Sequence, residues 1–195
     1  INGLGNGGAE KNLLRLIIND KKNDHEIIVL KKINFYNNIL KKEKIRFYQF
    51  DLSFNLSIYF SIKKIFKIIK NSRPDILMCW MYHASFLGAL ISILNGKIKL
   101  VWNIRHSSFV IGKSKFSTIF LARFIMPCFQ LTPNVIIYNS LHSLKIHRIF
   151  FLFKKKQIII RNGFNLPLKI NKKSLFNKKN FLKIGFVGRF SPQKN

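Results

Sequence analysis

Short apolar runs alternate with longer amphipathic segments along this chain. In the longer segments apolar residues recur three and four positions apart, as Leu14, Ile17 and Ile18 do in the first of them, which is the spacing of a helix with one buried face. The short runs show no alternation of apolar and polar side chains, and this is typical of parallel strands covered on both faces. The pattern therefore predicts an α/β fold with a doubly wound, Rossmann-like parallel sheet.

The expected elements follow one another in a regular order. Helices are predicted over 9–19, 56–70, 83–94, 116–129 and 141–153, and strands over 26–30, 44–50, 76–81, 100–104, 135–138 and 157–160. Residues 165–181 are polar, basic and aperiodic and predict a linker between a first domain, 1–164, and the start of a second, 182–195. We expect both ends to be cut, because a glycine-rich loop normally follows a strand and a strand needs partners.

Polar residues follow four of the predicted strands directly. They are Tyr82 and His83, Arg105 and His106, Asn139 and Ser140, and Asn162 and Gly163. The carboxyl ends of parallel strands meet at one edge of a sheet, where ligands of such folds bind. The glycine-rich loop at 3–10 opens a helix and belongs at the same edge, so the sequence predicts a site there.

That glycine-rich loop has more than one interpretation. Gly3, Gly5 and Gly8 match the spacing of a dinucleotide-binding fingerprint, while Lys31 and Lys32 stand where an acidic residue is expected and would suit a 2′-phosphate. A loop that opens a helix also suits any other phosphate or carboxylate. A tight turn without a ligand is the alternative.

The chain is strongly basic: 35 Lys and Arg against 7 Asp and Glu give a formal charge of +28. Such a field favours phosphates, acidic lipid or nucleic acid. Two explanations stay open, a selected anion-binding surface and the codon bias of an A/T-rich genome. The basic amphipathic helix 56–70 and the Phe-rich segment 146–156 are candidates for contact with an anionic membrane, with ordinary surface helices as the alternative.

Cysteine and histidine patterns give no metal site. Cys79 and Cys128 lie in apolar surroundings without CxxC spacing, so we expect buried free thiols in a reducing cytosol. His142 and His147 are five residues apart and do not share a helical face, which excludes a pair of helical ligands. No apolar run predicts a membrane-spanning helix, since the stretch after residue 115 is broken by Arg123 and Pro127.

Seven segments, in order along the chain, resemble family 4 glycosyltransferases, which have the two-domain GT-B fold. Gly7-Gly8-Ala9-Glu10 resembles the first loop of that family, 158–163 its strand before the interdomain linker, and 185–194 the start of its donor domain. The other four are 25–30, 73–76, 101–106 and 135–140. Two departures stand out: Asn195 replaces a glycine, and the Glu-x7-Glu motif that contacts the donor in that family does not occur within residues 1–195.

The resemblance implies retaining transfer of a hexose from a sugar nucleotide to a glycan or polyprenyl-linked acceptor in cell-surface polysaccharide biosynthesis. We expect no metal or other cofactor, because the sequence shows no cluster of metal ligands, and no nucleic acid partner, because nothing in it resembles an RRM, a KH loop or a helix-turn-helix. The enzyme would be cytoplasmic and work at the inner face of the membrane. Residues 1–164 would be the acceptor-side domain and 182–195 the start of the donor domain. Since the donor pocket belongs mostly to the second domain, we expect residues 1–195 to be inactive by themselves.

Transfer expels a diphosphate, whose charge the site must neutralise. By resemblance Arg189 and Lys194 hold this diphosphate together with Gly7 and Gly8, and His106 is the catalytic residue. Candidates for the acceptor or the cleft are Glu10, His83, Arg105, Ser140, Asn162 and Gly163.

Each of these roles has a structural alternative. Arg189 and Lys194 can be solvated cations, and His106 can be a packed or capping residue. Glu10 at a helix start complements the helix dipole without any ligand. For the whole chain, the alternatives are an NADP-dependent Rossmann oxidoreductase and a non-enzymatic basic module that binds anions.

Overall fold

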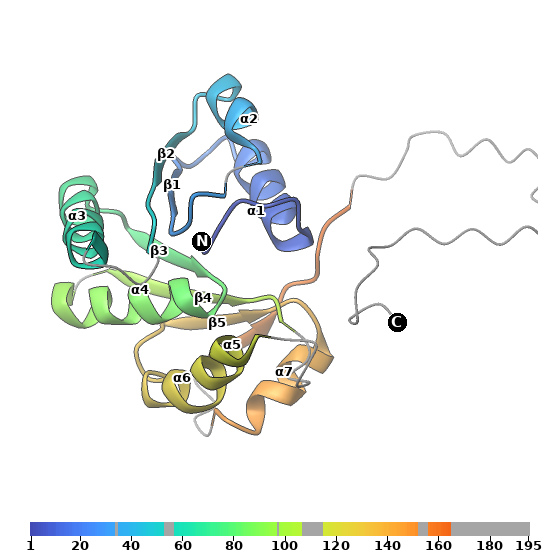
Figure 1. The fold of residues 1–195 in the computed structure, drawn as a ribbon. Coiled ribbons are helices and arrows are strands. Elements are labelled where there is room, and N and C mark those ends of the chain that lie inside the picture. The colour runs from blue at the N-terminus through green and yellow to red at the C-terminus, as the bar shows by residue number, and fades with distance from the viewer. Residues whose placement is uncertain (34, 53–56, 97, 107–114, 152–155, 165–195) are drawn as a thin grey trace, which may run out of the picture.

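The computed structural model describes residues 1–33, 35–52, 57–96, 98–106, 115–151 and 156–164 (Figure 1). Helices and strands alternate through these ranges. The strands are β1 (Glu26–Val29), β2 (Arg46–Gln49), β3 (Ile76–Trp80), β4 (Lys99–Ile104), β5 (Val135–Tyr138) and β6 (Gln157–Ile159). The helices are α1 (Gly8–Asn19), α2 (Asn37–Lys42), α3 (Ser57–Ser72), α4 (Tyr82–Asn95), α5 (Phe116–Phe120), the π-helical η1 (Leu121–Ile125), α6 (Met126–Cys128) and α7 (Leu141–Arg148).

All the described strand pairs are parallel, which confirms the predicted fold class. They form a four-stranded sheet in the order β3-β4-β5-β6 and a two-stranded sheet, β1-β2. In the larger sheet Trp80 lies opposite Asn103, and Tyr138 lies opposite both Ile104 and Ile159. This register brings the carboxyl ends of four strands to one edge.

The chain start lies along the smaller sheet. The backbone nitrogen of Ile1 donates to Ile28 O at 2.8 Å, and Leu30 N donates to Ile1 O at 3.0 Å. Leu4 then pairs with the segment after β1, because Leu4 N donates to Ile33 O and Phe35 N donates to Leu4 O, both at 2.7 Å. The glycine-rich loop is therefore held against the end of β1.

Two hydrophobic clusters fill the interior. The larger one packs α4, α5 and α7 on the four-stranded sheet, around Trp102, Leu100 and Ile104. The smaller one packs α1 on β1 and includes Trp80, the last residue of β3. Trp80 thus joins the two sheets through side-chain packing.

Several predicted elements differ from the structure. The predicted helix over 116–129 changes to π-helix at Leu121, the helix after β5 ends at Arg148 instead of 153, and α2 was not predicted. The short, lysine-bearing α2 has only Leu40 buried, so its apolar period is too brief to recognise.

Two predictions of burial were wrong. Ile76 and Met78 of β3 are exposed, because one face of this strand is covered only near Trp80. Cys79 is a buried free thiol, as expected, and burial raises its pKa to about 12, but Cys128 is exposed. Met126 takes the inward position on the short helix α6, which leaves Cys128 at its outer side.

Gly88 allows α4 to approach the sheet closely. A Cβ at this position would lie 2.3 Å from Cys79 Sγ and 3.1 Å from Leu100 Cδ1. We predict that Gly88→Ala lowers the free energy of unfolding by about 1–3 kcal/mol through overpacking, measured by urea denaturation.

The matched control removes the clashing sulfur. In Gly88→Ala combined with Cys79→Ala the new methyl group has room, so the double variant should be more stable than the sum of the two single effects. Strict additivity would show that the close approach is not the cause.

Candidate functional site

The carboxyl edge of the four-stranded sheet collects the polar residues that the sequence placed after its strands. His83 lies in the first turn of α4, Arg105 and His106 follow β4, Ser140 precedes α7, and Asn162 and Gly163 follow β6. The start of the chain reaches the same edge: Asn2 Nδ2 is 3.3 Å from His83 Nδ1, and Arg15 of α1 donates to Gly163 O at 3.1 Å. The predicted convergence is therefore present in the described residues.

Arg105 is the cation at the centre of this edge. Its guanidinium lies 4.5 Å from the centroid of the Trp80 ring, its Nε donates to Asn103 Oδ1 at 2.7 Å, and its Nη1 donates to Asn162 Oδ1. Burial lowers the pKa of Arg105 below its usual value, yet a guanidinium stays charged. None of the ion pairs among the described residues involves Arg105, so its charge is available to a bound anion.

His106, the predicted catalytic residue, contacts Ser143 and Tyr82. Its carbonyl oxygen accepts a hydrogen bond from Ser143 Oγ at 2.7 Å, and its ring meets that of Tyr82 edge to face with centroids 6.1 Å apart. His106 is half-buried. These contacts fix the backbone of the residue that follows Arg105.

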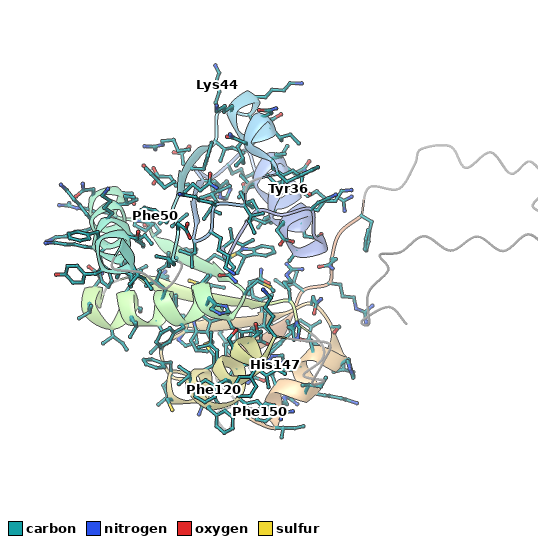
Figure 2. All side chains as sticks on the ribbon, viewed as in Figure 1. Tyr36, Lys44, Phe50, Phe120, His147 and Phe150 are labelled. Atoms are coloured by element: carbon teal, nitrogen blue, oxygen red, sulfur yellow. The ribbon has the colours of Figure 1, made fainter. Side chains whose placement is uncertain are left out.

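A buried polar network lies beneath His106. His147 is 1% exposed; its Nδ1 lies 2.7 Å from Ser143 O and its Nε2 lies 2.5 Å from the Tyr82 hydroxyl. Because the carbonyl can only accept, Nδ1 carries the proton and Nε2 accepts from Tyr82. Burial lowers the pKa of His147 to about 4, opposed by the Ser143 hydrogen bond and assisted by the charge of His106. The imidazole of His147, labelled in Figure 2, is thus neutral near pH 7.

The glycine-rich loop leaves the backbone at the start of α1 accessible to a ligand. A Cβ on Gly8 would meet nothing within 4 Å, so a ligand can approach the first turn there. A Cβ on Gly7 would lie 2.2 Å from Glu10 Oε2, which places the Glu10 carboxylate over the helix start. This position of Glu10 agrees with the helix-dipole alternative.

Two other predicted residues have structural partners. Ser140 caps α7, because its Oγ accepts from Ser143 N at 3.1 Å. His83 has its pKa lowered by burial, and then by the charges of Lys31 and Lys115, so its ring is neutral near pH 7. Arg189 and Lys194 lie outside the described residues, and their predicted roles stay predictions.

Sequence reasoning missed several members of this edge. The sequence marks Trp80 only as part of a predicted strand, Asn2 and Arg15 carry no local signal, and Asn103 sits inside β4. The spacing of His147 from His142 does not suit a helical metal pair, and the sequence gives no other signal for this residue. In the fold His147 forms a hydrogen bond with Tyr82, which is 65 residues away in sequence.

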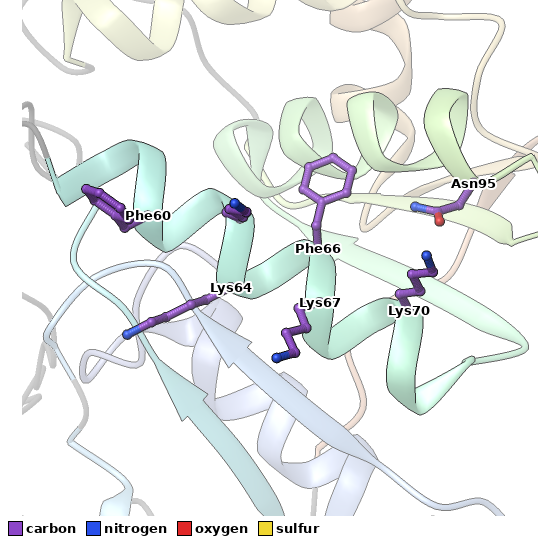
Figure 3. Close-up of a pocket in the computed structure, with 7 residues that line it drawn as sticks. Phe60, Lys64, Phe66, Lys67, Lys70 and Asn95 are labelled. Atoms are coloured by element: carbon purple, nitrogen blue, oxygen red, sulfur yellow. The ribbon is translucent and has the colours of Figure 1, made fainter.

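A separate groove lies along α3, away from this edge. It has a volume of about 450 Å³ and is lined by Phe60, Lys63, Lys64, Phe66, Lys67, Lys70 and Asn95 (Figure 3). Asn95 ends α4, whereas His83 lies in its first turn, so the rise of the helix between these two residues separates them by roughly 18 Å. The lysines of α3 do share one face, as the sequence predicts, but that face does not border the candidate site.

The described residues contain no group of three or more His, Cys, Asp or Glu side chains placed to hold a metal ion. Among the helices within the described ranges, none combines the length and apolar character needed to cross a bilayer.

Comparison with known proteins identifies the fold. No protein-family model matches this sequence, and no curated protein matches it. Two solved structures share the fold, Anabaena Alr3699/HepE in complex with UDP and the same protein in complex with UDP and glucose. Each gives a TM-score of 0.66, with 16% and 15% sequence identity.

These matches cover 84% and 85% of this chain but only 43% of each solved chain. The chain therefore spans less than half the length of the structures it resembles. It has the parallel α/β fold of about half of a GT-B-type chain, as the sequence predicted.

The buried imidazole of His147 predicts an acid-dependent loss of stability. Its pKa falls from 6.5 in the unfolded chain to about 4 in the fold, so between these values only the unfolded chain takes up the proton. The free energy of unfolding should then decrease as the pH falls through this window, by about 3 kcal/mol in total.

Urea denaturation at about pH 7 and about pH 4.5 measures this loss. His147→Gln should remove most of the difference between the two conditions, whereas His142→Gln, an exposed histidine of the same helix, should retain it. An equal pH response in both variants would contradict the assignment.

Proposed function

We propose that this chain forms the acceptor-side half of a retaining glycosyltransferase that uses a sugar nucleotide. Residues 1–164 would be the acceptor domain, 165–181 the linker and 182–195 the start of the donor domain. The observation that carries the proposal is Arg105: a half-buried cation, paired with amide oxygens and an indole ring, beside His106 at the carboxyl edge of a parallel sheet.

The chemistry of the edge suits departure of a diphosphate. Negative charge builds up on the leaving group, and fixed cations and backbone N–H groups stabilise it without reorganisation. Arg105, the start of α1 beside Gly7 and Gly8, and the proposed contacts from Arg189 and Lys194 would supply that environment. His106 would contact the transferred sugar, and His83 and Asn162 would border the acceptor.

Uridine diphosphate is the first nucleotide to test. The two HepE structures hold UDP, and one of them also holds glucose. Their likeness to this chain supports a sugar nucleotide as the donor, and the seven segments that resemble family 4 glycosyltransferases support a retaining mechanism. We further propose a glycan or polyprenyl-linked acceptor of cell-surface polysaccharide, reached from the cytoplasmic face of the membrane.

The NADP-dependent alternative is less compatible with the loop geometry. In a dinucleotide site the cofactor ribose enters between the glycine loop and the end of the following strand. Here Leu4 exchanges two backbone hydrogen bonds with Ile33 and Phe35 at that place. This pairing of the loop with the chain after β1 is the observation that counts against the NADP alternative.

We predict that His106→Ala lowers kcat/KM by about 100-fold, which is roughly 2.7 kcal/mol, in a protein that joins this chain to a donor-binding domain. The assay screens UDP-hexoses against glycan and polyprenyl-phosphate acceptors, and NMR of the product reads its anomeric configuration. His142→Ala is the matched control, since that side chain is exposed on α7. Inversion of the anomeric centre, or equal kinetics in both variants, would overturn the assignment.

We also predict that Arg189→Ala and Lys194→Ala each cost about 3–4 kcal/mol in kcat/KM, because each removes a charge directed at the leaving diphosphate. The same steady-state assay measures both. Kinetics within a factor of about three of the unmodified protein would instead identify them as solvated cations.

A further inference from the structure

The continuous helix formed by α5, η1 and α6 has one buried and one exposed apolar side. Ile119, Ala122 and Met126 face the core and are at most 7% exposed. On the opposite side Phe116, Phe120 and Phe124 are 79%, 47% and 63% exposed. A ladder of three exposed phenylalanines is costly in water and marks an interaction surface.

The three rings of this Phe ladder contact one another. The centroids of Phe116 and Phe120 are 6.4 Å apart, and those of Phe120 and Phe124 are 5.4 Å apart. Residues four apart drift by about 40° around an α-helix, and the wider turn of η1, which contains Phe124, reduces this drift between Phe120 and Phe124. The helix geometry therefore holds the ladder along one side.

Cations accompany the ladder. Lys115 is exposed immediately before it, and Arg123 is exposed within it, with its guanidinium 5.2 Å from the centroid of the Phe150 ring. Figure 2 shows Phe120 and Phe150 on the same side of the molecule. Lys145 and Arg148 of α7, which precede Phe150 in the chain, are also exposed cations.

Acidic residues are missing from this part of the sequence. All seven Asp and Glu residues lie at or before Asp75, so residues 76–195 contain none. The Phe ladder consequently lies in a part of the sequence that contains cations and no acidic residue, which favours a partner that is both apolar and anionic.

We propose that the Phe ladder docks on the surface of an anionic lipid bilayer. The three rings would enter the interface between headgroups and acyl chains, while Lys115 and Arg123 would contact lipid phosphates. A second copy of this chain fits less well, because it would bring two positively charged faces together. This membrane contact goes beyond the proposed sugar transfer, and each can fail without the other.

The proposal assigns a face that differs from the α3 groove. The α3 lysines flank Phe60, which is 64% exposed, and the half-buried Phe66, whereas the ladder offers three exposed rings that contact one another, with charge beside them. Replacing the phenylalanines of the ladder should therefore weaken membrane binding more than replacing the lysines of α3.

Flotation of the chain with vesicles tests this inference. Phosphatidylcholine vesicles are compared with vesicles that contain about one third phosphatidylglycerol, at low salt and at about 1 M salt, where the screening length is about 3 Å. We expect binding to the anionic vesicles that falls with salt. Phe120→Ser combined with Phe124→Ser should weaken it at least about tenfold, because two rings leave the interface.

Matched variants separate the ladder from general effects. Leu94→Ser removes an equally exposed apolar side chain at the end of α4, and should bind as the unmodified chain does. Arg123→Gln should weaken binding to anionic vesicles about threefold or more and leave the low binding to neutral vesicles unchanged. Far-UV circular dichroism confirms that each variant is folded.

Three results would overturn the proposal. They are equal binding to neutral and anionic vesicles, unchanged binding of the double Phe variant, and greater loss in the variant with Lys63, Lys64, Lys67 and Lys70 replaced by Gln. Self-association in sedimentation that the double Phe variant abolishes, without vesicle binding, would assign the ladder to a contact between copies of the chain.

Discussion

Parallel hydrogen bonding of β3, β4, β5 and β6 determines where the strand-end residues of the candidate site lie. The register sets Trp80 opposite Asn103 and Tyr138 opposite Ile104 and Ile159, so the residues after four strands emerge together. A slip by one residue would turn each strand over and separate Arg105 from both Trp80 and Asn162. The apolar core around Trp102 stabilises this register, because its side chains can be buried in only one alignment.

Neutral polar groups, more than opposite charges, hold the site together. Arg105 is oriented by two amide oxygens and an indole ring, and His106 rests on Ser143 and Tyr82. Cations bound in this way keep their charge for an incoming anion, whereas a salt bridge would neutralise it. This arrangement includes a buried imidazole: His147 must stay unprotonated to accept the hydrogen bond from the Tyr82 hydroxyl, and burial disfavours its charged form.

Charge and apolar surface are distributed unevenly over the molecule. The carboxyl edge, the α3 groove and the Phe ladder each carry positive charge, and Lys115 at the start of the ladder is close enough to His83 of the edge to lower its pKa. Only the ladder combines aligned, exposed rings with a region of sequence free of acidic residues. A basic composition alone, whatever its genomic origin, does not account for three phenylalanines directed away from a core that buries the other side of the same helix.

The sequence by itself determined the fold class, the order of the elements, and the set of strand-end residues that includes Arg105, His106 and Asn162. It could do so because hydrophobic periodicity is local and parallel topology brings strand ends together without further information. Only the tertiary structure decided the partners. Tyr82 meets His147, Arg15 meets Gly163 and Trp80 lies under Arg105 through contacts between distant segments. The π-helical turn, the exposure of Cys128 and the direction of the Phe ladder likewise depend on which side of a helix the core accepts, and no local pattern records that choice.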